Sequence, residues 1–412
     1  MTKKNKTVYV GYIGTTKVAF LKAVEKPAGF VELKALSARL ASGFEKGIVK
    51  DLAKATETLS NTVRDVLGPQ EKSIVPCRLV VSNVYLKNYT YQSSVYFHGT
   101  PHAITMRDVR AVMAQTRSIA TIPLKEVIVQ AVPQEFLVND LAGVQNPLGL
   151  EASRLGVTLR MLTLDFLVYS NLLKVFERSD LEVTEVIPSV LSSAQAVLTP
   201  EEKQTGVVLV VIGGRATHFA CYKNSVLVET RSIPMGGDSI TEVIARNLNV
   251  DYLDAQRLKE SFGSAAPKDE FRDELIPIPD SNGKKKYTIK RAKFEAQTAS
   301  GLRDFFEAIQ NEIEALQERY SPLNQMVFTG GGVRLDGFLE AMKESLFPTA
   351  RIGSAQGIHG PEALVTDPSF SSLIGGIGYT AKVQEHRLVS GERQNWMTRT
   401  VEVARNWIFE YL

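Results

Sequence analysis

One segment of this chain occurs twice, and this duplication limits the possible folds. Each copy holds a strand that ends in a glycine turn, then two further strands, then a helix. The turns are Gly14-Thr15-Thr16 and Gly213-Gly214. The first copy runs through strands 7–13, 17–25 and 29–38 to a helix near Asp51, and the second through strands 206–212, 218–222 and 225–233 to a helix near Asp238. Glycine turns let backbone N–H groups approach an anion closely, because no Cβ blocks the ligand. The duplication therefore predicts two related halves with a nucleotide cleft between them.

The composition indicates a globular protein with a sizeable core. A chain of 412 residues is long enough for about two or three domains. Hydrophobic residues make up 44% and charged residues 23%, which argues against disordered, collagenous and fibrous classes. The net charge of +3 is too small to indicate nucleic-acid binding. No secretory signal is visible, and no apolar run approaches the roughly 18 residues that a membrane-spanning helix needs. We therefore expect a cytosolic protein whose membrane contact is peripheral.

Side chains that carry catalysis or bind metals are sparse. Cys77 and Cys221 are far apart and lack metal-ligand spacing, so both are expected to be reduced and buried. His98 and His102 lie close in sequence, but the glycine and proline between them disfavour the helix that would bring both onto one metal. The G-x-S-x-G, H-E-x-x-H and P-loop motifs are missing from the sequence. The sequence thus predicts no catalytic residue and no metal site.

Two inserts interrupt the duplicated frame. Residues 86–165 read as a small α+β unit with short strands, including 127–132 and 159–164, a helix at 106–118 and a turn at 146–149. The second insert comprises a helix at 253–260, a polar loop with Pro267, Pro277, Pro279 and Lys284-Lys285-Lys286, and a long amphipathic helix at 296–320. We expect the loop to be solvated, with a binding patch on its lysines as the alternative. Helices 51–67, 171–178, 189–198 and 371–383 and strands 78–82 and 183–187 complete the frame.

A third glycine turn ends the strand 326–329. Gly330, Gly331 and Gly332 precede a helix whose inner face carries Leu335, Phe338, Leu339, Met342 and Leu346. A helix that starts after a glycine turn offers unpaired N–H groups and a positive dipole end, which suit a phosphate or a ribose. A plain tight turn is the alternative, but three glycine turns at strand ends favour a nucleotide.

The C-terminal segment reads as an amphipathic helix after a polar linker. Residues 384–395 are polar, and the segment 396–412 then places large apolar side chains on one stripe. The side chains on this stripe and beside it are Trp396, Thr400, Val403, Trp407, Ile408, Tyr411 and Leu412. Aromatic anchors on such a helix are typical of a membrane interface. A helix that packs on the protein's own core is the alternative.

Several segments resemble the FtsA family of bacterial cell-division proteins, from about Val8 to the last residue. The most specific of them, Val132-Pro133-Gln134-Glu135-Phe136 with Asn146-Pro147-Leu148-Gly149 and Arg154-Leu155, is similar to the end of the family's distinctive insert. The others are 43–51, 196–203, 234–238 and 329–332. Sugar kinases and Hsp70-type chaperones share the glycine turns but not this insert.

The resemblance implies an α/β, actin-like fold with two lobes of the duplicated ribonuclease-H type and a small α+β insert in the first lobe. The implied boundaries are 1–85 with 166–196 and 371–385 for the first actin-like subdomain, 86–165 for the insert, 197–240 with 321–370 for the second actin-like subdomain, 241–320 for a small helical subdomain, 386–395 for a linker and 396–412 for a membrane-targeting helix. Family members bind ATP, polymerise, bind the C-terminal peptide of FtsZ and other division proteins, and anchor the division ring to the cytoplasmic face of the inner membrane.

By the same resemblance, ATP would contact the three glycine turns and the helices that follow the second of them. The expected nucleotide-binding residues are Gly14, Thr15, Thr16, Lys17, Gly213, Gly214, Arg215, Thr217, Gly236, Gly237, Gln256, Lys259, Gly330, Gly331 and Gly332. The expected membrane-binding residues are Trp396, Val403, Trp407, Ile408, Tyr411 and Leu412.

The site departs from its family at four positions. Actin-like sites normally carry an Asp before each phosphate turn, which holds the water shell of Mg²⁺. Here these positions are Tyr12 and Val211, while Arg215 replaces a usual glycine and His218 a usual acidic residue. Without the carboxylates, Mg²⁺ loses its ligands on the protein and efficient ATP hydrolysis is not expected. Lys17 or Arg215 can still neutralise phosphate charge, so both a nucleotide-bound and an empty cleft stay open.

The leading hypothesis is therefore an actin-like protein that polymerises and tethers the FtsZ ring to the membrane, with a degenerate nucleotide site. An actin-fold phosphotransferase or ATPase is one alternative, which Tyr12 and Val211 disfavour. A scaffold of another envelope assembly, such as a pilus machine, is the other, and it predicts no affinity for FtsZ.

Overall fold

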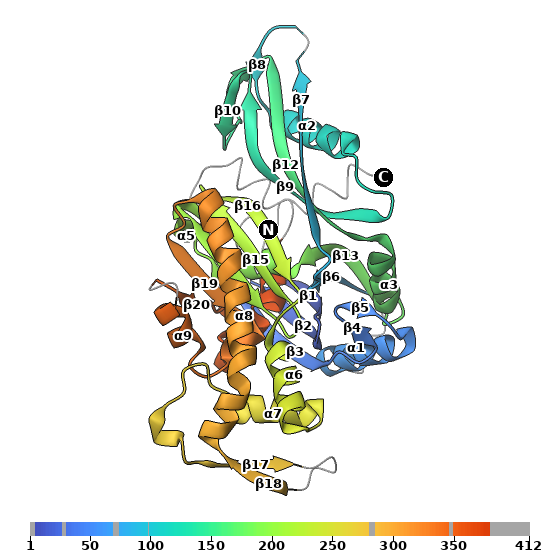
Figure 1. Cartoon of the computed structure of the whole chain (residues 1–412). Helices are drawn as coiled ribbons and strands as arrows, with labels where there is room; N and C mark the ends of the chain where they lie inside the picture. The colour runs from blue at the N-terminus through green and yellow to red at the C-terminus, as the bar shows by residue number, and fades with distance from the viewer. Residues whose placement is uncertain are drawn as a thin grey trace.

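The computed structural model of the chain describes residues 5–26, 30–68, 74–97, 99–279, 285–345 and 349–379. They form two lobes, each built on a mixed β-sheet, and an insert that projects from one end (Figure 1). Both halves follow the predicted order of strand, glycine turn, two strands and helix. The duplication inferred from the sequence is thereby confirmed.

The sheet of the first lobe has the strand order β13-β6-β1-β2-β3-β21. Its strands are β1 (Lys6–Ile13), β2 (Lys17–Glu25), β3 (Val31–Leu40), β6 (Val75–Val81), β13 (Leu181–Pro188) and β21 (Ile358–His359). One face packs against α1 (Leu52–Leu67) and α3 (Phe166–Glu177), with the small hairpin β4 (Phe44–Glu45) and β5 (Ile48–Val49) nearby. The carboxylate of Asp51 caps α1 by accepting from the Lys54 N–H at 3.0 Å, and Gly68 ends it, as the sequence predicts.

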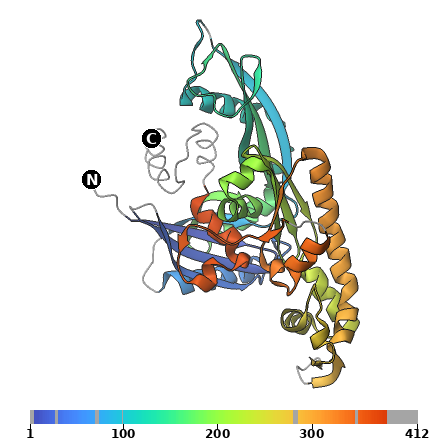
Figure 2. The same ribbon diagram turned by 90° about the vertical axis from the view of Figure 1, so that its left-hand side faces the viewer.

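The sheet of the second lobe has the order β16-β15-β14-β19-β20. Its strands are β14 (Val207–Ile212), β15 (Thr217–Lys223), β16 (Val226–Ile233), β19 (Gln325–Thr329) and β20 (Arg351–Ile352). Its outer face is covered by α6 (Gly237–Leu248), α7 (Tyr252–Phe262), α8 (Arg291–Tyr320) and α9 (Phe338–Ser345). Figure 2 shows α8 running along the outer side of this lobe. Every residue of β14 is buried, because the strand is covered on both faces.

A pair of helices between the two sheets joins the lobes into one core. These helices are α4 (Ser189–Val197) and α11 (Ser371–Gly378), and residues of both sheets pack on them. The short elements α5 (Pro200–Thr205), α10 (Glu362–Val365) and η3 (Pro368–Phe370) lie around this pair in the sequence. Small residues of α11 permit the packing: a Cβ on Gly375 would lie 1.8 Å from the Ser192 carbonyl oxygen, and one on Gly376 2.6 Å from Val10 Cγ1.

The insert is a four-stranded antiparallel sheet of order β10-β9-β12-β7 with one helix packed on it. Its elements are β7 (Lys87–Tyr96), β8 (His102–Ala103), α2 (Met106–Ile119), β9 (Glu126–Val138), β10 (Leu141–Val144), β11 (Glu151–Ala152) and β12 (Arg154–Asp165). The expectation of short strands is wrong for β9 and β12, which have 13 and 12 residues. They exceed the apolar runs seen in the sequence because both continue to pair with each other through polar positions such as Thr158 and Glu135.

Part of the segment expected to be a polar loop in the second insert is a β-hairpin. The predictions of a loop here and of a purely helical subdomain at 241–320 are therefore wrong. The strands β17 (Leu275–Pro279) and β18 (Lys285–Lys290) pair in an antiparallel manner, with Pro277 opposite Thr288. Prolines are tolerated here because a two-stranded sheet has only edge strands. Ile276, Ile278 and Ile289 bury the inner face of the hairpin against the second lobe.

Two further expectations need correction. The triple glycine does not lead straight into a helix: Gly331–Arg334 form a short 3₁₀ turn (η2), and α9 begins only at Phe338. In addition, β21 pairs with β3 of the first sheet, although the sequence groups residues 321–370 with the second lobe. The pairing of β21 with β3 joins residues far apart in the sequence, which local sequence patterns do not report.

Some predictions fall outside the described residues. They are the linker at 386–395, the membrane segment 396–412 with its residues, the end of the helix 371–383, and the single positions His98, Lys284 and Leu346. Among the described residues, no helix combines the length and apolar character needed to cross a membrane.

Candidate nucleotide cleft between the lobes

The two glycine turns of the duplicated halves meet at the junction of the lobes. Each turn first closes its own hairpin: the Gly14 N–H donates to the Lys17 carbonyl at 2.9 Å and the Gly213 N–H to the Ala216 carbonyl at 2.8 Å. The backbone N–H of Arg215 then donates to Thr15 Oγ1 at 3.1 Å, across the lobes. The structure thus brings together the two turns that the sequence singled out and places them in direct contact.

The start of α6 lies directly against the second turn. The N–H groups of Gly237 and Asp238 donate to the carbonyls of Gly213 and Gly214, at 3.0 and 2.7 Å. A Cβ on Gly236 would lie 2.5 Å from both of these carbonyl oxygens, so only glycine fits there. Two of the first amides of α6, which would suit an anion, therefore already have protein partners.

The cations among the expected nucleotide-binding residues also bind protein groups. Arg215 Nε lies 3.0 Å from Asp238 Oδ2, and Lys259 Nζ donates to the Gly237 carbonyl at 2.9 Å and to Thr241 Oγ1 at 2.7 Å. Lys17 Nζ donates to the Ser369 carbonyl, and burial lowers the pKa of this amine to about 8. Burial also lowers the pKa of Lys259.

His218, one of the residues singled out in the sequence, takes part in a hydrogen-bond chain between the lobes. Ser82 Oγ, just after β6, lies 2.9 Å from His218 Nε2 on β15, and His218 Nδ1 lies 2.7 Å from Ser232 Oγ on β16. Tyr12 lies on β1 beside β6, opposite Val80 in the parallel pair. Burial raises the pKa of Tyr12 to about 12 and lowers the pKa of His218 to about 4, so both are neutral at pH 7.

The remaining predicted residues are placed by packing or by local bonds. Gly330 and Gly332 lie against the end of β14, since a Cβ on them would lie 2.4 Å from the Ile212 oxygen and 2.1 Å from Ile212 Cγ2. Thr217 is fully buried and donates to the Met235 carbonyl at 2.8 Å. Gln256 donates to Glu260 on its own helix. These contacts explain the residues by packing, without reference to a ligand.

Sequence reasoning missed Ser82, Ser232 and Asp238 as members of this site. Asp238 was recognised only as a helix start, and the two serines carry no motif. Ser82 is the last residue of the predicted strand 78–82. This strand corresponds to β6, which pairs in parallel with β1, so its C-terminal end lies beside the first glycine turn.

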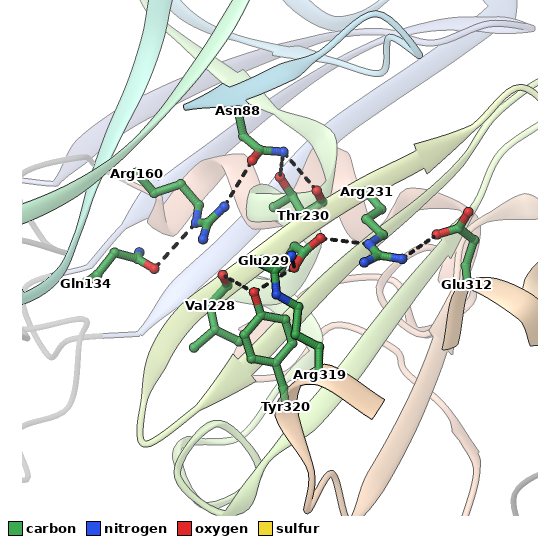
Figure 3. Close-up of polar contacts among 10 residues, drawn as sticks. All are labelled: Asn88, Gln134, Arg160, Val228, Glu229, Thr230, Arg231, Glu312, Arg319 and Tyr320. Atoms are coloured by element: carbon green, nitrogen blue, oxygen red, sulfur yellow. Dashed lines mark hydrogen bonds and ion pairs between the residues drawn. The ribbon is translucent and has the colours of Figure 1, made fainter. Parts of the chain in front are cut away.

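A second polar cluster connects the insert to the second lobe (Figure 3). Asn88 of β7 donates through Nδ2 to the Thr230 carbonyl of β16 at 3.0 Å and accepts from Arg160 of β12 at 3.0 Å. On the lobe side, Glu229 accepts from the Tyr320 hydroxyl at 2.6 Å and pairs with Arg231 at 2.7 Å. Although burial acts to raise it, the pKa of Glu229 lies below its usual value because of these hydrogen bonds.

Metal chemistry finds no support in the described part of the chain. Within it, no group of three His, Cys, Asp or Glu side chains is arranged to hold a metal ion. Cys77 and Cys221 are buried and free, as predicted, and burial raises the pKa of each thiol to about 12. Neither thiol therefore has the character of a nucleophile.

Relatives among known proteins match most of the chain. A family model described as "Cell division protein FtsA" matches residues 208–375, and one described as "SHS2 domain inserted in FTSA" matches 85–163. The chain is 25% identical to the cell division protein FtsA of Escherichia coli K12 over 405 residues, covering 94% of each chain. It is 26% identical to the FtsA of Bacillus subtilis over 344 residues, covering 82% of this chain and 76% of that protein.

Solved structures share the fold. A type IV pilus biogenesis complex of PilM and PilN contains a chain that superposes with a TM-score of 0.64 at 15% identity, covering 90% of this chain and 98% of that one. The ADP complex of MreB5 from Spiroplasma citri superposes with a TM-score of 0.53 at 14% identity, covering 92% and 98%. At such identities the likeness concerns the fold alone, and it confirms the actin-like class.

Proposed function

Because this chain belongs to the FtsA family of actin-like cell-division proteins, we propose that it polymerises and tethers the FtsZ ring to the cytoplasmic face of the inner membrane at the division site. The observation that carries the proposal is the insert. Its sheet and helix α2 project from the first lobe of an actin-like body, and the family model for this insert covers the same residues. Self-association and contact with the FtsZ C-terminal peptide and other division proteins belong to this proposal.

The proposed membrane contact rests on the sequence of residues 396–412. Its aromatic and aliphatic stripe suits a helix that lies in the membrane interface. Full burial of a large apolar side chain contributes roughly 1.5 to 3 kcal/mol, and an interfacial helix buries only one side, so a single tail binds reversibly. A polymer presents many tails to one surface, and avidity then holds the filament on the membrane.

The nucleotide site is proposed to be degenerate. ATP is the candidate ligand by family, but Tyr12 and Val211 offer no carboxylate to hydrated Mg²⁺. We expect no efficient ATP turnover. A phosphotransferase function would require phosphate release from ATP that disappears when residues of the cleft are substituted.

The test of the tether uses fluorescent fusions of the full chain in dividing cells. Midcell bands should form with the full chain and disappear when residues 396–412 are removed. Val403→Glu, which puts a charge on the apolar stripe, should have the same effect, whereas Thr398→Glu adds the same charge on the opposite side of a helix and serves as the control. Unchanged membrane recruitment after truncation would refute the membrane part of the proposal.

A pull-down with the FtsZ C-terminal peptide separates this function from that of a scaffold in another envelope assembly. The proposed function predicts retention of the protein on the peptide and none on a scrambled peptide. The scaffold predicts no retention in either case.

A further inference from the structure

The family implies a bound Mg-ATP, and the cleft residues can be tested for their fit to it. A nucleotide of this kind needs space between the two glycine turns, donors that are free to turn toward phosphate, and carboxylates for the hydrated metal. In the arrangement that the structure shows, side chains lie against both turns, and the cations expected at the site bind protein groups. The Asp238 carboxylate beside the second turn is paired with Arg215.

The space between the turns is filled by side chains of the protein. A Cβ placed on Gly214 would lie 2.3 Å from Thr16 Cγ2, and one placed on Gly14 would lie 2.6 Å from Tyr12 Cε1 and 2.8 Å from Tyr12 Oη. Thr16 therefore packs against the second turn, and the Tyr12 ring lies against the first. A phosphate between the turns would have to displace both side chains.

The position where an acidic residue usually follows the second turn holds His218, which binds hydroxyl groups instead of a metal. His218 bonds to Ser82 on one side and to Ser232 on the other. A neutral imidazole has one donor and one acceptor nitrogen, which matches a hydroxyl on either side. The chain links the end of β6 in the first lobe to β15 and β16 in the second, and none of its members carries a negative charge.

The insert supplies a second connection to the same lobe. Asn88 is held between Arg160 of the insert and Thr230 of β16, the strand that also carries Ser232 (Figure 3). The second lobe thus contacts the first lobe through His218 of β15 and the insert through Thr230 of β16.

We propose that the interlobe cleft of this protein is a permanent latch that takes the place of a nucleotide site: the Ser82–His218–Ser232 chain and the Thr15–Arg215 contact hold the lobes together, and Mg-ATP is not bound. This inference deepens the proposed degenerate site and resolves the choice between a bound and an empty cleft. It is independent of the proposed contacts with FtsZ and with the membrane.

Two measurements on the purified full chain test the latch. Titration calorimetry with Mg-ATP up to millimolar concentration should give no saturable binding, and Mg-ATP should not raise the melting temperature. Hydrogen exchange of the segments 11–17 and 213–218 should be slow without nucleotide and unchanged by Mg-ATP. Saturable binding that excess ADP displaces, or exchange that slows several-fold when Mg-ATP is added, would overturn the proposal.

Two serine variants test whether the hydrogen-bond chain holds the lobes together. Ser82→Ala removes the hydroxyl that the first lobe contributes to the chain and should speed exchange in both segments at least several-fold. Ser37→Ala on β3 removes a hydroxyl that bonds to Asp65 at the surface, and it should leave both segments unchanged. Equal exchange in the two variants would show that the chain does not hold the lobes. Neither measurement depends on midcell bands or peptide retention, so the latch and the tether fail or stand separately.

Discussion

Replacement of His218 by glutamine should remove a specific part of the pH dependence of stability. Burial lowers the pKa of His218 from 6.5 to about 4, so the unfolded chain binds a proton in this range that the folded chain does not. For such a group the stability contribution is fully present above the unfolded pKa of 6.5 and is lost as the pH falls towards 4. One pKa unit corresponds to about 1.4 kcal/mol, so lowering the pH from about 7.5 to about 5 should cost the wild type about 2 kcal/mol through this residue.

The assay is urea denaturation of the wild type and of His218→Gln at both pH values. Carboxylates also contribute to the loss of stability in acid, so the informative quantity is the difference between the two proteins. The wild type should lose about 2 kcal/mol more than the variant. His359→Gln, at an exposed position on β21, controls for the loss of an imidazole and should follow the wild type. If His218→Gln loses as much stability as the wild type between the two pH values, the assignment of His218 as a neutral buried link is wrong.

Three substitutions test other parts of the fold by denaturation. Gly375→Ala places a Cβ 1.8 Å from the Ser192 carbonyl oxygen, so the helix backbone must move. The free energy of unfolding should fall by more than about 3 kcal/mol, or soluble expression should be lost. A variant as stable as the wild type would refute this packing. Arg351→Ala should lower the free energy of unfolding by about 3 kcal/mol, because it leaves the buried Glu202 carboxylate without its paired guanidinium. Arg272→Ala removes an exposed ion pair and should lower the free energy of unfolding by less than about 0.5 kcal/mol. Tyr320→Phe should cost about 1 to 2 kcal/mol by removing the hydroxyl bonded to Glu229, and no change would argue against the network in Figure 3.

Much of the fold could be predicted because its signals are local. In the strands around Gly14 and around Gly213-Gly214, apolar residues alternate with polar ones or form short continuous runs. Asp51 and Gly68 mark the two ends of α1. Such patterns depend on neighbours in the sequence, so the duplicated frame and the position of the insert follow from the residues themselves. The hairpin of β17 and β18 was not predicted, because its prolines are typical of loops. Prolines fit a strand only at an edge position, and the partner strand that creates this position is not visible in a local pattern.

The repeated frame, the family resemblance and the non-acidic residues Tyr12, Val211 and His218 can all be read from the sequence alone. The contacts that surround these residues depend on the folded chain. Thr15 meets Arg215 across 200 residues of chain, and Ser82 meets His218 across 136. A contact of this kind depends on how two lobes pack on the shared α4 and α11 layer, and no local pattern encodes that distance. The identity of the side chains at these positions could therefore be read from the residues, whereas their contacts across the lobes could be seen only in the folded chain.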